Sequence, residues 1–104
     1  MKNTSPILND INEYLVFVSQ VKNLSENTTK SYERDLKKLN LFLEKLNITN
    51  YSDIKEEICS AWIGDLYSQN NKPKSIQRHL SSAKGFFRFL KKNNLISSSP
   101  FELV

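Results

Sequence analysis

The sequence predicts an all-α fold, a four-helix bundle that forms a single domain. Its 104 residues include only two glycines and three prolines, and a strand-rich sandwich would need more turn residues than that. Four segments carry apolar residues at spacings of three and four, as amphipathic helices do. The connectors between these segments are short, which favours antiparallel neighbours in a compact bundle.

Two helices are predicted over the first half of the chain. The first runs from about Asn9 to Lys22, and the second begins between Ser25 and Asn27, residue types that cap helices well. The expected core residues of the first helix are Leu8, Ile11, Leu15 and Val18. Those of the second helix are Tyr32, Leu36, Leu39, Leu43 and Leu46.

The second half predicts two further helices and a tail. The third helix is expected to begin at Ser52 or Asp53, where Glu56 would complete a capping box, and the fourth runs from Lys74 or Ser75 to about Asn93. The third should bury Ile54, Ile58, Cys59, Trp62 and Leu66. The fourth should bury Ile76, Leu80, Ala83, Phe86, Phe87 and Leu90. Residues 96–104 are expected to be a linker rather than a closing element, so the domain would span residues 1–95.

Positive charge is concentrated on two of these helices. The chain carries a net charge of +4, and the Lys72–Asn94 segment holds seven Lys or Arg residues and no acid. Opposite the core, the fourth helix should present Lys74, Arg78, Ser81, Gly85, Arg88 and Lys92, flanked by Ser75, Gln77, Ser82 and Lys84. The second helix should present Lys30, Arg34 and Lys37 in the same way. We call these two surfaces the predicted basic faces.

The predicted basic faces favour nucleic-acid binding. Any soluble amphipathic helix shows charges opposite its core, but ordinary solvated faces mix both signs. The serines and Gln77 among the bases can donate to phosphates or base edges. Gly85 is either a tolerated weak point of the helix or a place where the backbone approaches a partner. Phe89 fits neither stripe, and we expect it to contact a partner.

Other readings of the same residues stay open. The domain could be a helical protein-interaction module that docks an acidic partner, or a stand-alone DNA-binding regulator. His79, the only histidine, is expected to be structural or to contact one phosphate. The sequence contains no zinc cluster, phosphate loop or complete catalytic set. No cofactor, metal or small-molecule substrate is therefore predicted. With one cysteine, no signal peptide and no long apolar run, a cytoplasmic protein without membrane contact is expected.

Two stretches resemble the core-binding domain of tyrosine recombinases. Residues 24–36, LSENTTKSYERDL, are similar to the family pattern LS-x-NT-x-x-x-Y-x-x-D-L. Residues 74–90, KSIQRHLSSAKGFFRFL, are similar to the last helix of that domain, and NNLISSSPFELV resembles its exit into the catalytic domain. The Xer type looks closest. The resemblance implies a SAM-like four-helix domain that forms half of a C-shaped clamp, with its second and fourth helices on the major groove.

The resemblance also implies DNA contacts and protein partners. The contacts it implies are Thr28, Lys30, Ser31, Arg34, Lys74, Ser75, Arg78, Ser82 and Lys84, with Gln77 close to the groove. The predicted basic faces add Lys37, Ser81 and Arg88. Three positions depart from the family pattern: Lys84 stands where arginine is frequent, Ser82 where alanine is common, and Ser99 where asparagine is usual. Lysine at position 84 keeps the charge but lacks the planar fork of arginine.

Recombinases of this family act on double-stranded DNA as synaptic tetramers, in chromosome dimer resolution or in integration. Val16 and Phe17, which lie off the first core stripe, are expected to contact another protomer. The catalytic residues of the family belong to a C-terminal domain outside these 104 residues. No catalytic residue is therefore assigned here, none of the four tyrosines is expected to be the nucleophile, and the chain alone is not expected to be an enzyme.

Overall fold

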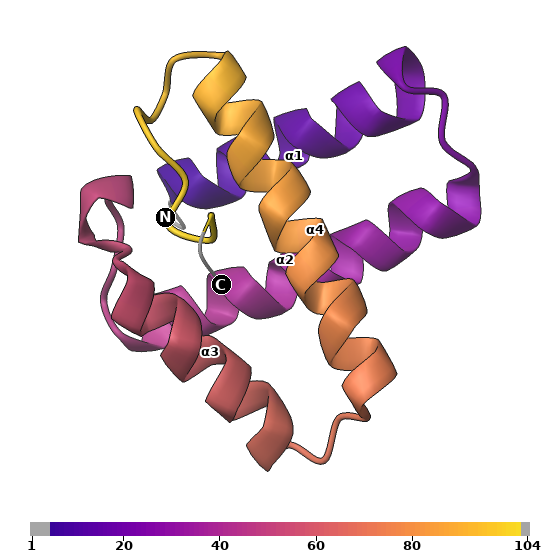
Figure 1. Ribbon diagram of the computed structural model, residues 1–104. Coiled ribbons are helices and arrows are strands. Elements are labelled where there is room, and N and C mark those ends of the chain that lie inside the picture. The colour runs from indigo at the N-terminus through magenta and orange to yellow at the C-terminus, as the bar shows by residue number, and fades with distance from the viewer. Residues whose placement is uncertain (1–4, 103–104) are drawn as a thin grey trace, which may run out of the picture.

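The structure is a computed structural model that describes residues 5–102. Over that range it is all-α, as predicted, and contains no strand. The elements are α1 (Pro6–Val16), a π-helical turn η1 (Phe17–Val21), α2 (Glu26–Lys45), a 3-10 turn η2 (Tyr51–Asp53), α3 (Glu56–Ser68) and α4 (Pro73–Lys92). Figure 1 shows α4 crossing α2 near the middle of both helices. Helix α4 also contacts α1 and α3, and α1 packs along α2.

Two of the helices begin at serine N-caps. Ser5 Oγ accepts a hydrogen bond from the Leu8 amide at 3.0 Å, and Pro6 supplies the first helical residue. Pro is favoured there because its missing N–H would be unpaired anyway. Helix α1 therefore begins three residues before the expected Asn9. Ser25 Oγ caps α2 in the same way, as predicted.

The start of α3 differs from the prediction. Residues Tyr51–Asp53 form the separate turn η2, and Ile54 is extended. The helix begins at Glu56, and Lys55 occupies its N-cap position without a side-chain cap. The capping box built on Ser52 or Asp53 is therefore wrong, because the chain changes direction between those residues and the helix.

Each of the four long helical segments is followed by an asparagine in the left-handed conformation. These residues are Asn23, Asn47, Asn70 and Asn94, with φ between 55° and 63°. Asparagine tolerates this region better than other side-chain-bearing residues, so it replaces the glycine that usually ends a helix. The following amide then bonds back to the helix, as Ile48 N–H does to the Leu43 carbonyl at 2.9 Å. This arrangement reverses the chain within a few residues.

Most of the predicted core is confirmed. The buried apolar residues are Ile7, Ile11, Tyr14, Val18, Leu36, Leu39, Leu43, Ile54, Cys59, Trp62, Leu66, Ile76, Ala83, Phe86, Phe87, Leu90 and Phe101. In α1 the stripe is shifted by one residue, so that Leu8 and Leu15 are only partly buried. Leu46 is 45% exposed because it follows the last turn of α2.

The C-terminal segment packs against the bundle. Phe101 is fully buried, with its ring centroid 5.2 Å from that of Phe87 and 6.0 Å from that of Trp62. The Cys59 thiol lies 3.5 Å from the Pro100 carbonyl. The expectation that this segment plays no part in closing the core is therefore wrong. The domain boundary at residue 95 stays a prediction, and residues 103 and 104 lie outside the described range.

Candidate nucleic-acid interface

The exposed face of α4 is rotated from the predicted one. The helix buries polar residues beside its apolar stripe, where it packs against Trp62 of α3 and Asp35 of α2. The buried polar residues of α4 are His79 and Ser82. At about 100° per residue, the buried side is turned by roughly 40° toward Ser82. The opposite edge, which carries Gln77 and Lys84, therefore becomes the outer surface.

A row of five side chains forms this outer surface, and we call it the α4 ridge. It consists of Lys74, Gln77, Ser81, Lys84 and Arg88. Their spacing of three and four residues aligns them along the helix. Lys84 is partly buried and the other four are exposed. Within residues 5–102 the three bases of the ridge have no ion-pair partner, so their charge is available to an anionic ligand.

Asp35 of α2 is fully buried where α2 and α4 meet. Arg78 donates from Nε to Asp35 Oδ2 at 3.0 Å and from Nη2 to Oδ1 at 2.8 Å. Ser82 Oγ donates to Oδ2 at 2.8 Å. A buried carboxylate is tolerated only when it is paired and hydrogen-bonded. Two side chains of α4 thus make the burial of Asp35 possible and connect the two helices.

Because of these contacts, the predicted site residues Arg78 and Ser82 differ in their access to a ligand. The Arg78 side chain is 44% exposed, so it reaches solvent as well as Asp35. Its hydrogen bond to Asp35 raises the pKa of Arg78. Ser82 is fully buried. It cannot contact a ligand unless the helices separate, so we leave Ser82 out of the interface. Ser75 is partly buried, and its carbonyl accepts a hydrogen bond from His79.

His79 is a structural residue. It is 2% exposed and lies beside Trp62, with ring centroids 6.1 Å apart. Nδ1 lies 2.7 Å from the Ser75 carbonyl oxygen and 3.4 Å from Asp35 Oδ1. This geometry assigns a proton to Nδ1, because a carbonyl oxygen can only accept. Its burial excludes the phosphate contact that the sequence left open.

The side of α2 next to α4 carries three of the predicted site residues. Thr28 and Ser31 are partly buried, and Arg34 is exposed. Arg34 Nη2 donates to Ser31 Oγ at 3.3 Å. At about 100° per residue, Thr28 and Ser31 fall on the same side of the helix as Asp35. Thr28 and Ser31 therefore share the side of α2 that bonds to Arg78 through Asp35, and Arg34 reaches that side through its hydrogen bond to Ser31.

Lys30 and Lys37 lie on another side of α2. At about 100° per residue they point roughly opposite to Asp35. Each forms an ion pair with the glutamate four residues before it, Lys30 with Glu26 at 3.5 Å and Lys37 with Glu33 at 2.9 Å. Such exposed pairs contribute only about 0.3–0.5 kcal/mol, but they give this surface both signs of charge. The structure thus does not join these two lysines to the α4 ridge.

Gly85 and Phe89 face α1 rather than a partner. A Cβ at Gly85 would lie 2.5 Å from Tyr14 Oη, so the missing side chain makes room for the tyrosine. The ring of Phe89 lies 5.2 Å from Tyr14 and 5.1 Å from Phe17, measured between centroids. The expected partner contacts of Phe89 and Phe17 are therefore replaced by contacts inside the bundle. Val16 remains 54% exposed.

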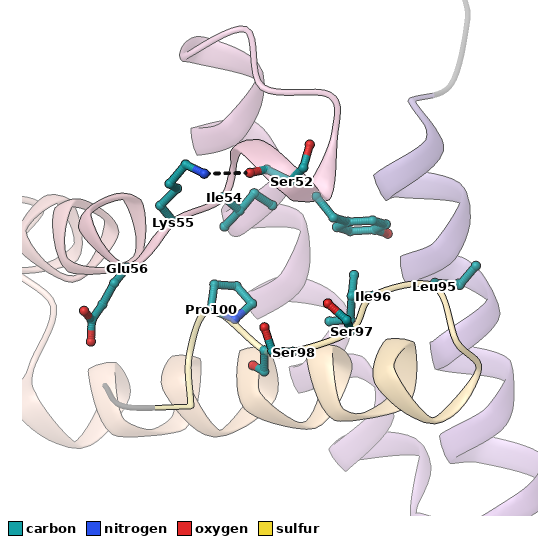
Figure 2. Close-up of a pocket in the computed structure, with 11 residues that line it drawn as sticks. Ser52, Ile54, Lys55, Glu56, Leu95, Ile96, Ser97, Ser98 and Pro100 are labelled. Carbon is teal, nitrogen blue, oxygen red and sulfur yellow. Dashed lines mark hydrogen bonds between the residues drawn. The ribbon is translucent and has the colours of Figure 1, made fainter.

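A pocket of the described structure lies outside this interface. It measures about 530 Å³ and lies between η2, the start of α3 and residues 95–100. Figure 2 shows Lys55 reaching the Ser52 carbonyl at its rim and the side chains of Ser97 and Ser98 on the opposite wall. Within the described residues there is no group of His, Cys, Asp or Glu that could hold a metal ion. In the same range no helix is long and apolar enough to span a membrane.

Sequence reasoning missed Asp35 as a functional candidate. It is the D of the Y-x-x-D-L pattern in residues 24–36, but an acid at the edge of the core stripe of a helix gives no sign of its burial. The sequence feature that could have indicated Asp35 is the group of polar residues on the edge of α4 that carries Ser82. A buried acid on one helix requires donors on the helix it packs against.

Comparisons with known proteins agree with this architecture. The chain matches the family described as Phage integrase, N-terminal SAM-like domain, over residues 11–94. It is 34% identical over 94 residues to tyrosine recombinase XerD of Staphylococcus haemolyticus, a match that covers 90% of this chain and 32% of that protein. The XerD proteins of Staphylococcus saprophyticus and Staphylococcus aureus are 34% and 32% identical over the same coverage.

The chain spans about a third of the length of these curated relatives. No solved structure matches it. The family match nevertheless covers most of α1 and all of α2, α3 and α4, the helices that form the core and carry the α4 ridge. The chain therefore belongs to the family of phage integrase N-terminal SAM-like domains.

Proposed function

We propose that this chain is the DNA-clamping N-terminal domain of a site-specific tyrosine recombinase. The α4 ridge and the side of α2 that carries Thr28, Ser31 and Arg34 bind double-stranded DNA. The observation that carries the proposal is the α4 ridge itself, a line of bases without acidic partners in the described part of the chain. Phosphates attract such a line, and the polar residues between the bases can approach base edges.

The parent protein would act in the cytoplasm, as part of a synaptic tetramer. Its reaction is strand cleavage and rejoining, in chromosome dimer resolution or in integration. This domain holds the duplex against a catalytic domain in which a tyrosine attacks a DNA phosphate. Its own contribution is the position and orientation of the duplex. Lys30 and Lys37 contribute at most long-range attraction, because each is paired with a glutamate.

The salt dependence of duplex binding tests this proposal. Binding of the 104-residue chain to a 30-base-pair duplex is measured between low and physiological salt. Each phosphate contact contributes about 0.9 to the slope of log K against log salt. Lys84→Gln and Arg88→Gln should each lower the slope by about that amount. Lys55→Gln, an equal charge change at an exposed residue outside the interface, is the matched control.

Equal slopes for all three variants would refute the interface. If the chain bound no duplex but bound polyglutamate in a way that depended on Lys84 and Arg88, the protein-interaction module would replace the DNA clamp. Arg78→Ala is not a clean test of DNA binding. It removes the main partner of the buried Asp35 and would lower the stability of the fold as well.

A further inference from the structure

We propose that Asp35 is a positioning residue for DNA recognition, which holds Arg78 as an oriented, charge-neutral donor to a base edge. The inference rests on the proposed function and assigns different roles to the bases of the interface. Arg78 would discriminate between sequences, whereas Lys74, Lys84 and Arg88 of the α4 ridge would supply attraction to phosphates. Asp35 itself is buried and would touch no DNA.

The first argument is the orientation of the guanidinium. Arginine has five N–H groups in a fixed plane. The Nε group and one N–H of Nη2 donate to Asp35, which leaves three N–H groups on Nη1 and Nη2. Because the edge formed by Nε and Nη2 is tied to a buried carboxylate, the edge formed by Nη1 and Nη2 points away from it. With the side chain 44% exposed, that edge is open to a ligand.

The second argument is the rigidity of the anchor. Asp35 is fully buried, and its Oδ2 also accepts the Ser82 hydroxyl at 2.8 Å. The carboxylate therefore cannot rotate without breaking a buried hydrogen bond. Arg78 has lost its rotamer freedom before a ligand arrives, so binding need not supply that entropy. A supported side chain of this kind gives directional recognition that a mobile surface lysine lacks.

The third argument is charge. Arg78 and Asp35 together are neutral, so the pair adds little to the release of counterions that drives binding to phosphates. What remains is a set of paired donors, which matches the two acceptors on the major-groove edge of guanine. The bases of the α4 ridge form no ion pair within the described part of the chain; the acid nearest in the fold, Glu102, pairs with Lys91 instead. Charge and orientation thus separate Arg78 from its neighbours.

The experiment compares two duplexes. The chain first selects a 30-base-pair duplex from a random pool, and a scrambled duplex of equal composition serves as the reference. The ratio of the two dissociation constants measures discrimination. Arg78→Lys should lower the ratio by roughly 5- to 150-fold, the range for one bidentate arginine contact. Arg88→Lys, the same change on the α4 ridge, should leave the ratio unchanged.

Asp35→Asn distinguishes a positioning role from a purely structural one, because the two roles predict opposite changes in binding to the scrambled duplex. It leaves the Arg78 charge without its neutralising partner, so binding to the scrambled duplex should strengthen and its salt slope should rise by about 0.9. The ratio should fall at the same time. A structural role alone would weaken binding to both duplexes in proportion to the unfolded fraction, which circular dichroism reports, and that result would overturn the inference.

The remaining outcomes also decide the matter. If Asp35→Asn does not fold, Arg78→Lys decides alone, and a retained ratio overturns the inference. A wild-type chain that selects no sequence, yet depends on Lys84 and Arg88 for its salt slope, would overturn the role of Arg78 while the DNA clamp stands. A wild-type chain that binds no duplex would remove both proposals.

Discussion

Replacing Phe101 by alanine tests whether the C-terminal segment completes the core. The side chain is fully buried against Phe87 and Trp62. Truncation of a buried phenylalanine typically costs about 3–5 kcal/mol, from lost transfer energy and from the cavity that remains. Domains of this kind have a free energy of unfolding of about 5–15 kcal/mol. The substitution should therefore remove a large part of the stability.

Urea unfolding of the 104-residue chain measures this loss. Trp62 is the only tryptophan and contacts Phe101, so its fluorescence reports on the site, and circular dichroism reports on the helices. With a urea dependence of about 1–3 kcal/mol per molar, the midpoint should fall by roughly 1–5 M. Leu95→Ala is the control, because Leu95 lies near the same segment but is 49% exposed.

The control should change the free energy of unfolding by no more than about 1 kcal/mol, as partly exposed positions usually do. If Phe101→Ala were no more destabilising than Leu95→Ala, the C-terminal segment would be a detached linker in solution. The contact of Phe101 with the core would then have to be abandoned.

Two further predictions concern residues with unusual surroundings. Gly85→Ala should destabilise the wild-type chain because its Cβ meets Tyr14 Oη. In the Tyr14→Phe background the same change should stabilise the fold by about 1 kcal/mol, the helix preference of alanine. Thermal melts of the four chains would contradict this if Gly85→Ala lowered the melting temperature in both backgrounds. Burial, and to a lesser extent Glu56, raises the pKa of the Cys59 thiol to about 12. The thiol should therefore resist an aromatic disulfide reagent at pH 8 until urea is added. Rapid labelling of the folded chain would instead show that the core is open at this position.

The helices were predictable because their signals are local. Apolar spacings of three and four, the serine before α2 and the scarcity of glycine all act within a few residues along the chain. The errors at helix starts have the same origin. Ser5 was overlooked as an N-cap, and η2 was merged with α3 because a 3-10 turn and a helix start share residue preferences.

The asparagine helix ends were readable in principle. Asn23, Asn47, Asn70 and Asn94 each follow the last turn of a helical segment. Three of them precede an apolar residue, and two of these residues, Leu24 and Ile48, pack against the core. In a chain with two glycines, asparagine is the remaining residue suited to the left-handed region. This pattern would have placed the helix C-termini without any knowledge of the fold.

The interface was predicted only in part. The bases of the α4 ridge were identified from the sequence, because a helix that buries one side must expose the other. The rotation of that exposed side was not predictable, since it depends on how many neighbours cover α4. One apolar stripe indicates a single buried side of a helix, whereas α4 contacts three other helices.

The sequence by itself determined the all-α class, most of the core and the concentration of positive charge on α4, because these depend on residue type and spacing along one element. Only the tertiary structure decided that Arg78 is anchored by Asp35, that Ser82 and His79 are interior, and that Phe101 closes the core. These contacts join residues more than 30 positions apart in sequence or lie between different helices. Their partners are chosen by packing, and packing leaves no periodic trace in the chain.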